Sequence, residues 1–363
     1  MRVLVVTTWF PSDGRPEEAP FVLEHVRAIA RDHDVRVLHI RLGAAGAPTT
    51  ETYQGIRVRR LPLSPRRPLD LLRAWREIGA AAAKADVVHT MAFSSIGVAA
   101  PVLLLRRRPW VHTEHWSGVS DPRSVGGLWP RLAGARRLLR LPDRLTAVSS
   151  QLAAVLERFG RPGAVRVVPC VVDNRAPITA APFGERIELI AVGGLVTGKR
   201  PLLAVETLAW LVAHGHDARL TWLGSGPLRD ETAALACDRG ISDRLALAGR
   251  VAPEQVYGRI SAADLFFLPT AGETFLASAA EALSCGRAVV LPSTGGFVDF
   301  VDACNGELVD DATPEAFGTA IVRAFGRFAS VAPEVLAEPI RKRFDPQVIG
   351  DEFDALYREV VPR

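Results

Sequence analysis

The sequence predicts an α/β protein built from two doubly wound, Rossmann-like parallel-sheet domains, and three observations lead to this prediction. Its 363 residues are too many for one typical hydrophobic core and suit two. Short, wholly apolar segments of strand length alternate with segments of helical periodicity, which is the pattern of parallel sheets covered on both faces. The alternation stops at a proline-rich stretch and then starts again.

Each element of the first run follows from its residue pattern. Residues 2–10 (RVLVVTTWF) form an apolar run of strand length that enters a polar loop, and residues 35–40 (VRVLHI) form another. Between them, residues 21–34 carry apolar side chains at helical spacing, so the start of the chain predicts a β–α–β unit. Further buried strands are predicted at residues 85–90, 109–114 and 144–149.

The second run begins after NRAPITAAPFGER, a stretch rich in proline and small residues that is typical of a linker. The chain ends in the amphipathic segment PQVIGDEFDALYREVV. We predict a first domain at residues 1–172, a linker at 173–186, a second domain at 187–344 and a C-terminal helix at 345–363 that packs back on the first domain. Strands of the second domain are predicted at residues 187–195, 218–226, 245–249, 264–270 and 287–292.

Composition points to a soluble protein of a reducing compartment. Hydrophobic residues make up 48% of the chain and charged residues 23%, which is ordinary for a globular protein. The apolar run at the N-terminus is too short for a signal peptide or a membrane span. The cysteines lack metal-ligand or disulfide-framework spacing, so we expect a cytoplasmic protein. They are Cys170, Cys237, Cys285 and Cys304.

Charge is distributed unevenly. Residues 1–172 hold 26 lysines and arginines against 14 acidic residues, whereas the remainder holds 18 against 26. A basic first half favours a phosphate-rich partner or an anionic membrane surface. The arginines are scattered and lack interleaved aromatic residues, so we do not expect a nucleic-acid partner.

In parallel sheets, ligands bind beyond the carboxyl ends of the strands, so polar segments in the loops there are the candidate ligand sites. GSGPLR follows a predicted strand, but Arg229 stands where a third dinucleotide-binding glycine would be needed. The acidic pair in DHD (residues 32–34) lies between a helix and a strand and is expected to be a solvated turn rather than a metal site. Neither segment carries a functional prediction by itself.

The segment AVGGLVTGKRP has the features of an anion site. A strand runs into glycines, and Lys199 precedes a helix that opens at Pro201. A helix N-terminus beside a lysine suits a bound anion. Arg200 follows the lysine, so the segment is not a Walker loop, and a solvated turn is the alternative.

Two glutamates stand eight positions apart in TAGETFLASAAEALSCGRAVV. A helix predicted from Phe275 to Ser284 places Glu273 before its first turn and Glu281 within its second. At about 1.5 Å per residue they are roughly 12 Å apart, too far to share a proton or a metal. The spacing suits an elongated ligand with hydroxyl groups at both ends and an anionic middle. The alternative is a pair of ordinary helix-surface acids.

At this point the sequence resembles the GT-B glycosyltransferases of family 4, which use nucleotide sugars and retain the anomeric configuration. The Glu-x7-Glu segment with the following STGG and NGELV is the strongest element. The resemblance covers nearly the whole chain. Supporting segments are AVGGLVTGKRP, LGSGPLRD, LAGRVAPEQVYGRISAADLFFLP, RLTAVSSQLAAVL and VRVVPCVVD.

This resemblance implies two domains that face a cleft, the first on the acceptor side and the second binding the donor, with a C-terminal helix crossing back. It implies a hexosyl- or N-acetylhexosaminyl-type transferase that moves a sugar from a UDP- or GDP-linked donor to a hydroxyl of a lipid-linked glycan or natural product. No metal and no cofactor are implied.

Site residues are implied by position. Lys199 matches the lysine that neutralises the donor diphosphate, and Glu281 the glutamate that holds the ribose hydroxyls. Glu273 matches the glutamate that reaches the transferred sugar. The amides of Thr274, Phe275 and Leu276 would cap the distal phosphate.

Other matches and departures complete the implied site. His115 falls at the position of a histidine that faces the donor sugar, and Arg250 and Val251 would flank the base. Gly194 stands where the family usually has the second cation of the diphosphate clamp, and Arg200 or Arg250 could replace it. Thr274 and Leu276 stand at glycine positions of the family, as does Ala19 in the first domain.

His115 also raises a zinc interpretation, because VHTEHWSG contains His112, Glu114 and His115. No further ligand stands at helical or turn spacing from these neighbouring residues, so we expect no zinc there. The other alternative is that His115 has a structural role and does not face the donor sugar.

The acceptor and the location of the protein are left open. WPRLAGARRLLRLP (residues 129–142) mixes arginine with apolar residues, which suits a helix on an anionic membrane and equally an ordinary covering helix. A GT-B epimerase and a non-catalytic nucleotide-sugar-binding protein are the competing classes. A phosphorylase is disfavoured because no lysine is placed to anchor pyridoxal phosphate.

Overall fold

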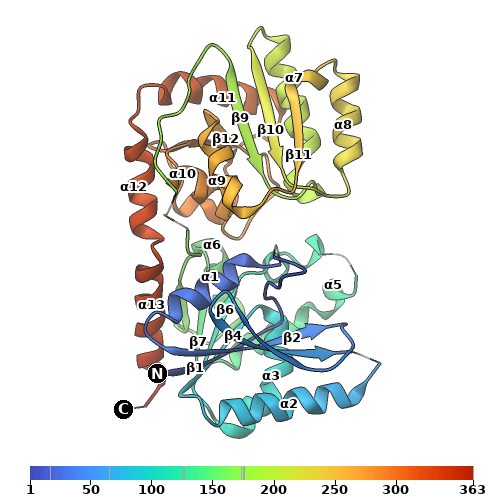
Figure 1. The fold of residues 1–363 in the computed structure, drawn as a ribbon, viewed down its shortest axis with the longest axis vertical. Helices are drawn as coiled ribbons and strands as arrows, with labels where there is room; N and C mark the ends of the chain where they lie inside the picture. Colours follow the sequence, from blue (N-terminus) through green and yellow to red (C-terminus); the bar gives the residue numbers. More distant parts are fainter. Residues whose placement is uncertain (17, 65, 126, 173, 175, 363) are drawn as a thin grey trace. The chain divides into compact units, whose positions relative to one another are not determined.

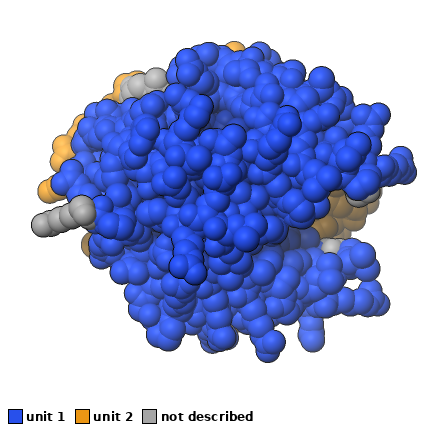
Figure 2. Space-filling model, turned by 90° about the horizontal axis from the view of Figure 1, so that it is seen from below, with its two compact units in different colours: residues 1–171, 346–363 blue, residues 172–345 orange. Residues whose placement is uncertain are grey.

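The computed structural model describes residues 1–16, 18–64, 66–125, 127–172, 174 and 176–362. The chain forms two compact units, which Figure 2 colours separately. Unit 1 comprises Met1–Val171 together with Pro346–Arg363, and unit 2 comprises Val172–Asp345. Each unit has a largely or wholly parallel sheet and packed helices, which confirms the predicted fold class (Figure 1).

Unit 1 contains an eight-stranded sheet in the order β3-β4-β2-β1-β5-β6-β7-β8. Its strands are β1 (Arg2–Thr7), β2 (Asp34–Leu42), β3 (Thr49–Tyr53), β4 (Ile56–Leu63), β5 (Val87–Met91), β6 (Trp110–Glu114), β7 (Arg144–Ala147) and β8 (Val165–Val167). β3 and β4 form an antiparallel hairpin at one edge, and the other neighbours are parallel. Its helices are α1 (Pro20–Ile29), α2 (Pro68–Ala82), α3 (Phe93–Arg106), α4 (Ser117–Ser120), α5 (Trp129–Leu132), α6 (Ser150–Phe159) and α13 (Pro346–Val360).

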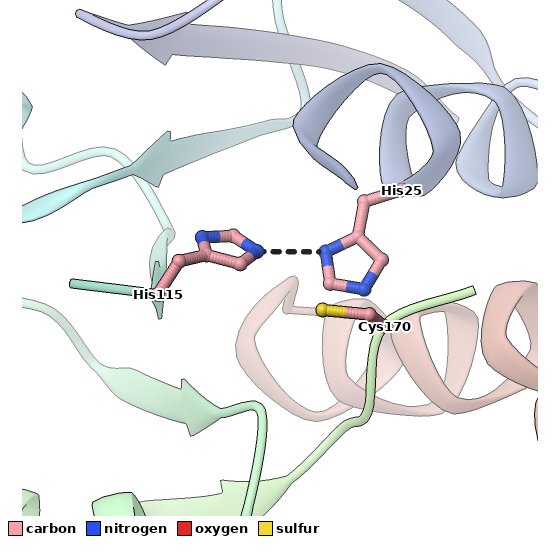
Figure 3. A group of neighbouring side chains, drawn as sticks. All are labelled: His25, His115 and Cys170. Atoms are coloured by element: carbon pink, nitrogen blue, oxygen red, sulfur yellow. Dashed lines mark hydrogen bonds between the residues drawn. The ribbon is translucent and has the colours of Figure 1, made fainter. Parts of the chain in front are cut away.

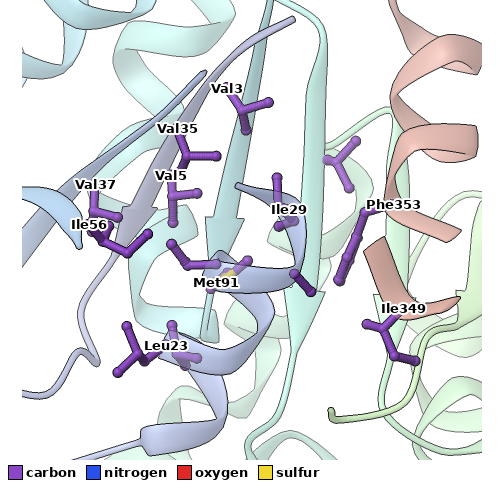
Figure 4. Close-up of a cluster of buried hydrophobic side chains, with 14 of the residues drawn as sticks. Val3, Val5, Leu23, Ile29, Val35, Val37, Ile56, Met91, Ile349 and Phe353 are labelled. Atoms are coloured by element: carbon purple, nitrogen blue, oxygen red, sulfur yellow. The ribbon is translucent and has the colours of Figure 1, made fainter. Parts of the chain in front are cut away.

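The C-terminal helix α13 completes the core of unit 1. Its Ile349 and Phe353 pack with α1 and with the buried valines of β1 and β2 (Figure 4). A Cβ added at Gly350 would lie 2.8 Å from the carbonyl oxygen of Ala28, so a glycine permits the close approach of α13 to α1. The C-terminal helix is therefore part of unit 1, although the whole of unit 2 separates it from the rest of unit 1 in the sequence.

Unit 2 contains a wholly parallel six-stranded sheet in the order β11-β10-β9-β12-β13-β14. Its strands are β9 (Ile187–Val192), β10 (Ala218–Leu223), β11 (Leu245–Gly249), β12 (Leu265–Phe267), β13 (Ala288–Pro292) and β14 (Gly306–Val309). Its helices are α7 (Pro201–Ala213), α8 (Arg229–Asp238), α9 (Pro253–Ser261), α10 (Ala277–Ser284), α11 (Pro314–Phe328) and α12 (Pro333–Arg343). Several begin at a proline, whose fixed φ suits the first turn.

The segment that precedes β9 lies along unit 2. The buried guanidinium of Arg287 donates to the carbonyl oxygens of Thr179 and Ala180, at 2.6 and 3.1 Å. The carboxylate of Asp264 accepts the N–H of Phe183 at 2.6 Å. These bonds satisfy buried charged groups and fix the entry of the chain into β9.

The helix predicted from Phe275 begins two residues later, at Ala277. Leu276 precedes it with φ at 68°, in the left-handed region, which an α-helix cannot include. Leu276 is one of two non-glycine residues with positive φ at positions where the resemblance implies glycine; the other is Ala19, with φ at 50°. The backbone shape expected for glycine is thus kept at both positions.

The basic segment at residues 129–142 is not the single helix expected from its pattern. It consists of the short α5 and a 3-10 helix over Ala133–Arg140. Trp129 packs its ring against Trp116 and donates its indole N–H to Gly118, and Leu139 is fully buried. Two apolar residues of the expected membrane face therefore point into the protein. No helix among the described residues is long and apolar enough to span a bilayer.

Candidate functional site

The candidate site of unit 2 lies where the strand order reverses. β9 and β12 are neighbours, whereas the chain after β9 passes first to β10 and β11 on the other side. In doubly wound sheets with this order, the carboxyl ends of the two central strands border a crevice that binds ligands. The loops that leave β9 and β12 carry Lys199 and Glu273, respectively.

The loop after β9 places Lys199 over a glycine. Residues Thr197–Lys199 form a 3-10 turn, Arg200 has φ at 51°, and α7 then starts at Pro201. A Cβ at Gly193 would lie 3.3 Å from Cε of Lys199. The absence of a side chain at Gly193 therefore leaves room for the lysine stem.

Lys199 and Glu273 contact each other directly. Nζ of Lys199 donates to Oε1 of Glu273 at 2.5 Å, and their side chains are 19% and 22% exposed. The hydroxyl of Thr270 donates to the same carboxylate oxygen at 2.9 Å. The carbonyl oxygen of Glu273 accepts the N–H of Gly296 at 2.7 Å. Both the side chain and the backbone of Glu273 are therefore held in place.

The N-terminus of α10 lies beside this pair. Ser278 in the first turn donates its hydroxyl to the carbonyl oxygen of Val192, the last residue of β9, at 3.2 Å. The first turn of an α-helix has N–H groups without intrahelical partners and carries partial positive charge. A cation and a helix N-terminus therefore adjoin the carboxyl end of β9.

The predicted residues around this helix differ in what they can offer. Phe275 is buried, with its ring against Phe300 and Phe344, so its backbone amide is the group it can present to a ligand. Leu276 is also buried. Glu281 lies within α10 and is partly exposed, one turn past the helix start.

The GSG segment has a structural explanation. A Cβ at Gly224 would lie 2.0 Å from the carbonyl oxygen of Gly193, and one at Gly226 would lie 2.4 Å from that of Leu195. The N–H of Gly224 also donates to the carbonyl oxygen of Gly249 at 2.7 Å. These glycines let the loops after β9, β10 and β11 pack backbone to backbone, and so support the lysine loop.

The remaining predicted residues of unit 2 lie in the same set of loops. Arg250 and Val251 follow β11, and Arg250 is exposed. A Cβ at Gly194 would meet the carbonyl oxygen of Ser225 at 3.5 Å, which is an ordinary van der Waals contact. A side chain at position 194 is therefore sterically allowed.

His115 belongs to unit 1, where it follows β6. It is buried, its Nε2 lies 3.1 Å from Nδ1 of His25, and its ring centroid lies 4.8 Å from that of Phe21. Burial lowers the pKa of His115 well below its ordinary value, and the neighbouring His25 lowers it further. Burial also lowers the pKa of His25, to about 4. Both rings are therefore neutral at pH 7.

The other residues of the zinc interpretation pair with each other and with the backbone. His112 Nε2 lies 3.3 Å from Oε2 of Glu114, and both side chains are fully buried. Oε1 of Glu114 accepts the N–H groups of His115 and Trp116, each at 2.9 Å. Glu114 thus fixes the turn that carries His115.

Sequence reasoning missed several residues at these places. Thr270 and Ser278 both lie in the segment TAGETFLASAAEALSCGRAVV. Thr270 stands three positions before Glu273, and this spacing could have predicted their hydrogen bond. His25 and Cys170 reach His115 only through the tertiary fold, and no local pattern marks them.

Comparison with protein families accounts for most of the chain. The family described as Glycosyltransferase Family 4 matches residues 19–175. The family described as Glycosyl transferases group 1 matches residues 186–326.

Individual proteins with similar sequences or folds are as follows. D-inositol 3-phosphate glycosyltransferase of Xylanimonas cellulosilytica is 29% identical over 371 residues, covering 90% of this chain and 88% of that protein. 2-deoxystreptamine glucosyltransferase of Streptomyces kanamyceticus is 28% identical over 232 residues, covering 60% and 58%. The structure of Anabaena Alr3699/HepE in complex with UDP and glucose matches with a TM-score of 0.81 at 18% identity, covering 99% of this chain and 100% of that one.

Proposed function

Because this chain belongs to the family 4 glycosyltransferases and has the GT-B fold, we propose a retaining, metal-independent transfer reaction for it. A hexosyl or N-acetylhexosaminyl unit passes from a UDP- or GDP-linked donor to a hydroxyl group of the acceptor. The observation that carries this proposal is the contact of Lys199 with Glu273 at the strand-order reversal, beside the N-terminus of α10.

Lys199 and α10 supply the positive charge that the leaving group needs. As the glycosidic bond breaks, negative charge grows on the donor diphosphate, and preorganised cationic groups stabilise it. Lys199 binds the diphosphate, and the amides of Thr274, Phe275 and Leu276 cap the distal phosphate. Charge stabilisation by these groups requires no metal ion. Arg200 or Arg250 supplies the second cation in place of the one missing at Gly194.

The two glutamates hold the two ends of the donor. The carboxylate of Glu281 accepts hydrogen bonds from the ribose hydroxyls, and Glu273 accepts them from the transferred sugar. On donor binding, Lys199 exchanges its bond with Glu273 for one with the diphosphate. The ion pair thus holds Lys199 near the diphosphate position and Glu273 near the sugar position before the donor binds. Arg250 and Val251 flank the base of the donor.

The departing phosphate deprotonates the acceptor hydroxyl as the new glycosidic bond forms, so the sugar keeps its anomeric configuration. His115 takes part as a neutral ring, because its lowered pKa leaves it unprotonated at pH 7. It therefore hydrogen-bonds a donor-sugar hydroxyl rather than donating a proton as an acid.

The acceptor is a hydroxylated natural product or a lipid-linked glycan. The names of the two relatives above, with inositol 3-phosphate and 2-deoxystreptamine as acceptors, support a cyclitol hydroxyl. Exposed Leu128 and Leu132 beside Arg131 support the second option, because apolar and cationic side chains together suit the surface of an anionic membrane. We therefore place the protein in the cytoplasm, with peripheral contact to the inner face of the membrane in the second case.

Turnover assays test the proposal. The protein is incubated in EDTA with UDP-glucose, UDP-N-acetylglucosamine or GDP-mannose and with inositol 3-phosphate, 2-deoxystreptamine or phosphatidylinositol vesicles. Release of nucleoside diphosphate that depends on the acceptor, with an NMR-defined product of retained configuration, is expected. Inversion at the anomeric carbon, or a requirement for added metal, contradicts the proposed reaction.

The same assays separate the alternatives. A non-catalytic nucleotide-sugar-binding protein binds a donor without turnover in any acceptor mixture. An epimerase converts the free nucleotide sugar without an acceptor. The departure at Gly194 is the observation that keeps the binding protein as the second candidate.

A further inference from the structure

Three residues with metal-ligating side chains converge inside unit 1. His25 comes from α1, His115 follows β6, and Cys170 follows β8 (Figure 3). One ligand atom from each residue lies within 4.8 Å of the others, and all three residues are buried. Their positions in the sequence are far apart, so the fold alone creates this group.

The two imidazoles lie at a separation that suits a shared ion. Nδ1 of His25 and Nε2 of His115 are 3.1 Å apart and point toward one another (Figure 3). Two nitrogens bound tetrahedrally to one zinc ion, each at 2.0–2.1 Å, would be separated by about 3.3 Å. To become ligands, the two nitrogens must separate by a few tenths of an ångström, and each ring must turn so that its lone pair points to an ion beside the line that joins them.

Groups beyond the three residues orient them. Nε2 of His25 lies 2.8 Å from the carbonyl oxygen of Pro169, which accepts its N–H and leaves the lone pair of Nδ1 toward His115. Metal-binding histidines usually have this kind of carbonyl partner on the second ring nitrogen. The rings of Phe21 and Phe353 lie about the two histidines, with centroids 4.8 and 5.2 Å away, and provide an apolar surrounding.

We propose that His25, His115 and Cys170 form a three-ligand site for a thiophilic divalent metal ion of the zinc class. Two imidazoles and a thiolate are the donors that zinc prefers over magnesium or calcium. Binding replaces three metal–water bonds by one metal–sulfur and two metal–nitrogen bonds. The thiol proton of Cys170 is released to solvent, and the proton that Nε2 of His115 donates to His25 moves to Nδ1 of the same ring, so that both ligating nitrogens have a lone pair. Three protein ligands leave a fourth position for water.

Occupancy by a metal has a consequence for His115 that rests on the proposed function. A metal bound at Nε2 of His115 replaces the hydrogen bond to His25 and holds the imidazole ring on the ion, so the ring can no longer adjust to a donor sugar. The ion is therefore an inhibitor of transfer, and not a part of the catalytic site.

Metal titration of the full-length protein tests the site without any substrate. Cobalt(II) is added to the reduced, metal-free protein, and the thiolate-to-cobalt charge-transfer band is followed, then displaced with zinc(II). The wild type and Cys237→Ser, which removes an exposed cysteine of α8, are expected to bind one equivalent with this band. Cys170→Ser is expected to lose the band, and His25→Gln to bind about tenfold or more weakly.

Several outcomes overturn the proposal. The wild type lacking the thiolate band, or Cys170→Ser keeping it, excludes Cys170 as a ligand. Unchanged affinity in a folded His25→Gln excludes the imidazole pair. A melting curve for each variant shows whether it is folded. If a variant does not fold, the wild-type spectrum still tests the proposal, because it shows whether a thiolate binds the metal. If zinc binds but does not inhibit the transfer reaction, the metal site stands and only the predicted inhibition through His115 is wrong. If the protein catalyses no transfer reaction at all, the proposed function is wrong and the metal site is unaffected.

Discussion

Lys199 donates a hydrogen bond to Glu273 across 74 positions of sequence, at 2.5 Å. The cation assigned to the donor diphosphate is thus held by the carboxylate assigned to the donor sugar. Such a pair, with each side chain about one-fifth exposed, stabilises the protein only modestly. Its significance lies in the competition that it sets up between Glu273 and a diphosphate for the same lysine.

Replacing Glu273 with glutamine should strengthen the binding of a bare nucleoside diphosphate while lowering turnover. The substitution frees Lys199 and removes a negative charge near the phosphates, so about two- to fivefold tighter binding is expected. Isothermal titration calorimetry measures the change. Lys199→Met serves as the opposite variant and should weaken binding. Weaker binding to Glu273→Gln would show that the carboxylate does not compete with the diphosphate.

Gly226→Ala should destabilise unit 2 and impair the lysine loop. Its Cβ would lie 2.4 Å from the carbonyl oxygen of Leu195, so the loops after β9 and β10 must separate. A loss of about 1–3 kcal/mol in the free energy of unfolding is expected, with weaker diphosphate binding. Gly258→Ala in α9 is the control, since its Cβ meets nothing within 4 Å and alanine favours a helix by about 1 kcal/mol. Equal stability of the two variants would contradict the packing argument.

Arginine at position 194 should fit and should strengthen diphosphate binding. The added Cβ makes ordinary contact with the carbonyl oxygen of Ser225, and the backbone of Gly194 is not in the left-handed region. A hydrogen bond to a charged group contributes roughly 1.5–3 kcal/mol, so Gly194→Arg is expected to bind about tenfold or more tightly. Gly194→Gln is the control, because it adds a long polar side chain at position 194 without a positive charge. If both variants bind equally, the diphosphate does not reach position 194.

His39 should make the stability of unit 1 depend on pH. Its ring is buried with Nδ1 2.7 Å from the Arg60 guanidinium, and burial followed by that positive charge lowers its pKa from 6.5 to about 3. Above pH 6.5 the ring is neutral in both states, so its full contribution is present. Below pH 6.5 the unfolded chain takes up a proton that the folded protein rejects, and stability falls by about 1.4 kcal/mol per pH unit until about pH 3.

Urea unfolding at pH 7, 6 and 5 measures this slope for the wild type and for His39→Gln. The variant lacks the titrating ring, so the difference in stability between the two proteins should shrink as the pH falls. The other buried histidines contribute equally to both proteins and cancel in this comparison. A difference that stays constant across the range would mean that His39 is protonated in the folded state or titrates alike in both states.

The sequence predicted the fold well because its strand segments are apolar throughout and alternate with helical periodicity. It also marked Lys199 and Glu273 separately, since each follows a strand in a loop with polar residues. It could not predict their contact, because pairing across 74 positions depends on which strands become neighbours. The strand order places β12 beside β9, and that placement brings the two loops together.

Other features were outside the reach of local pattern. The late start of α10 depends on the left-handed backbone of Leu276, a conformation that leucine rarely adopts and that no leucine pattern predicts. The segment at residues 129–142 has amphipathic spacing, but tertiary packing of Trp129 and Leu139 divides it. The histidine pair joins α1 to the end of β6 and is visible only once the fold is known.

Calorimetric titration of the wild type and of Glu281→Ala with UDP, GDP and dTDP in EDTA tests the central claim most directly. Glu281 is a partly exposed helix residue and alanine is a strong helix former, so the variant should fold. One diphosphate should bind the wild type without metal and bind the variant about tenfold or more weakly, because hydrogen bonds to a charged group contribute roughly 1.5–3 kcal/mol. If no diphosphate binds, or if the variant binds as the wild type does, unit 2 does not hold the donor in the way described.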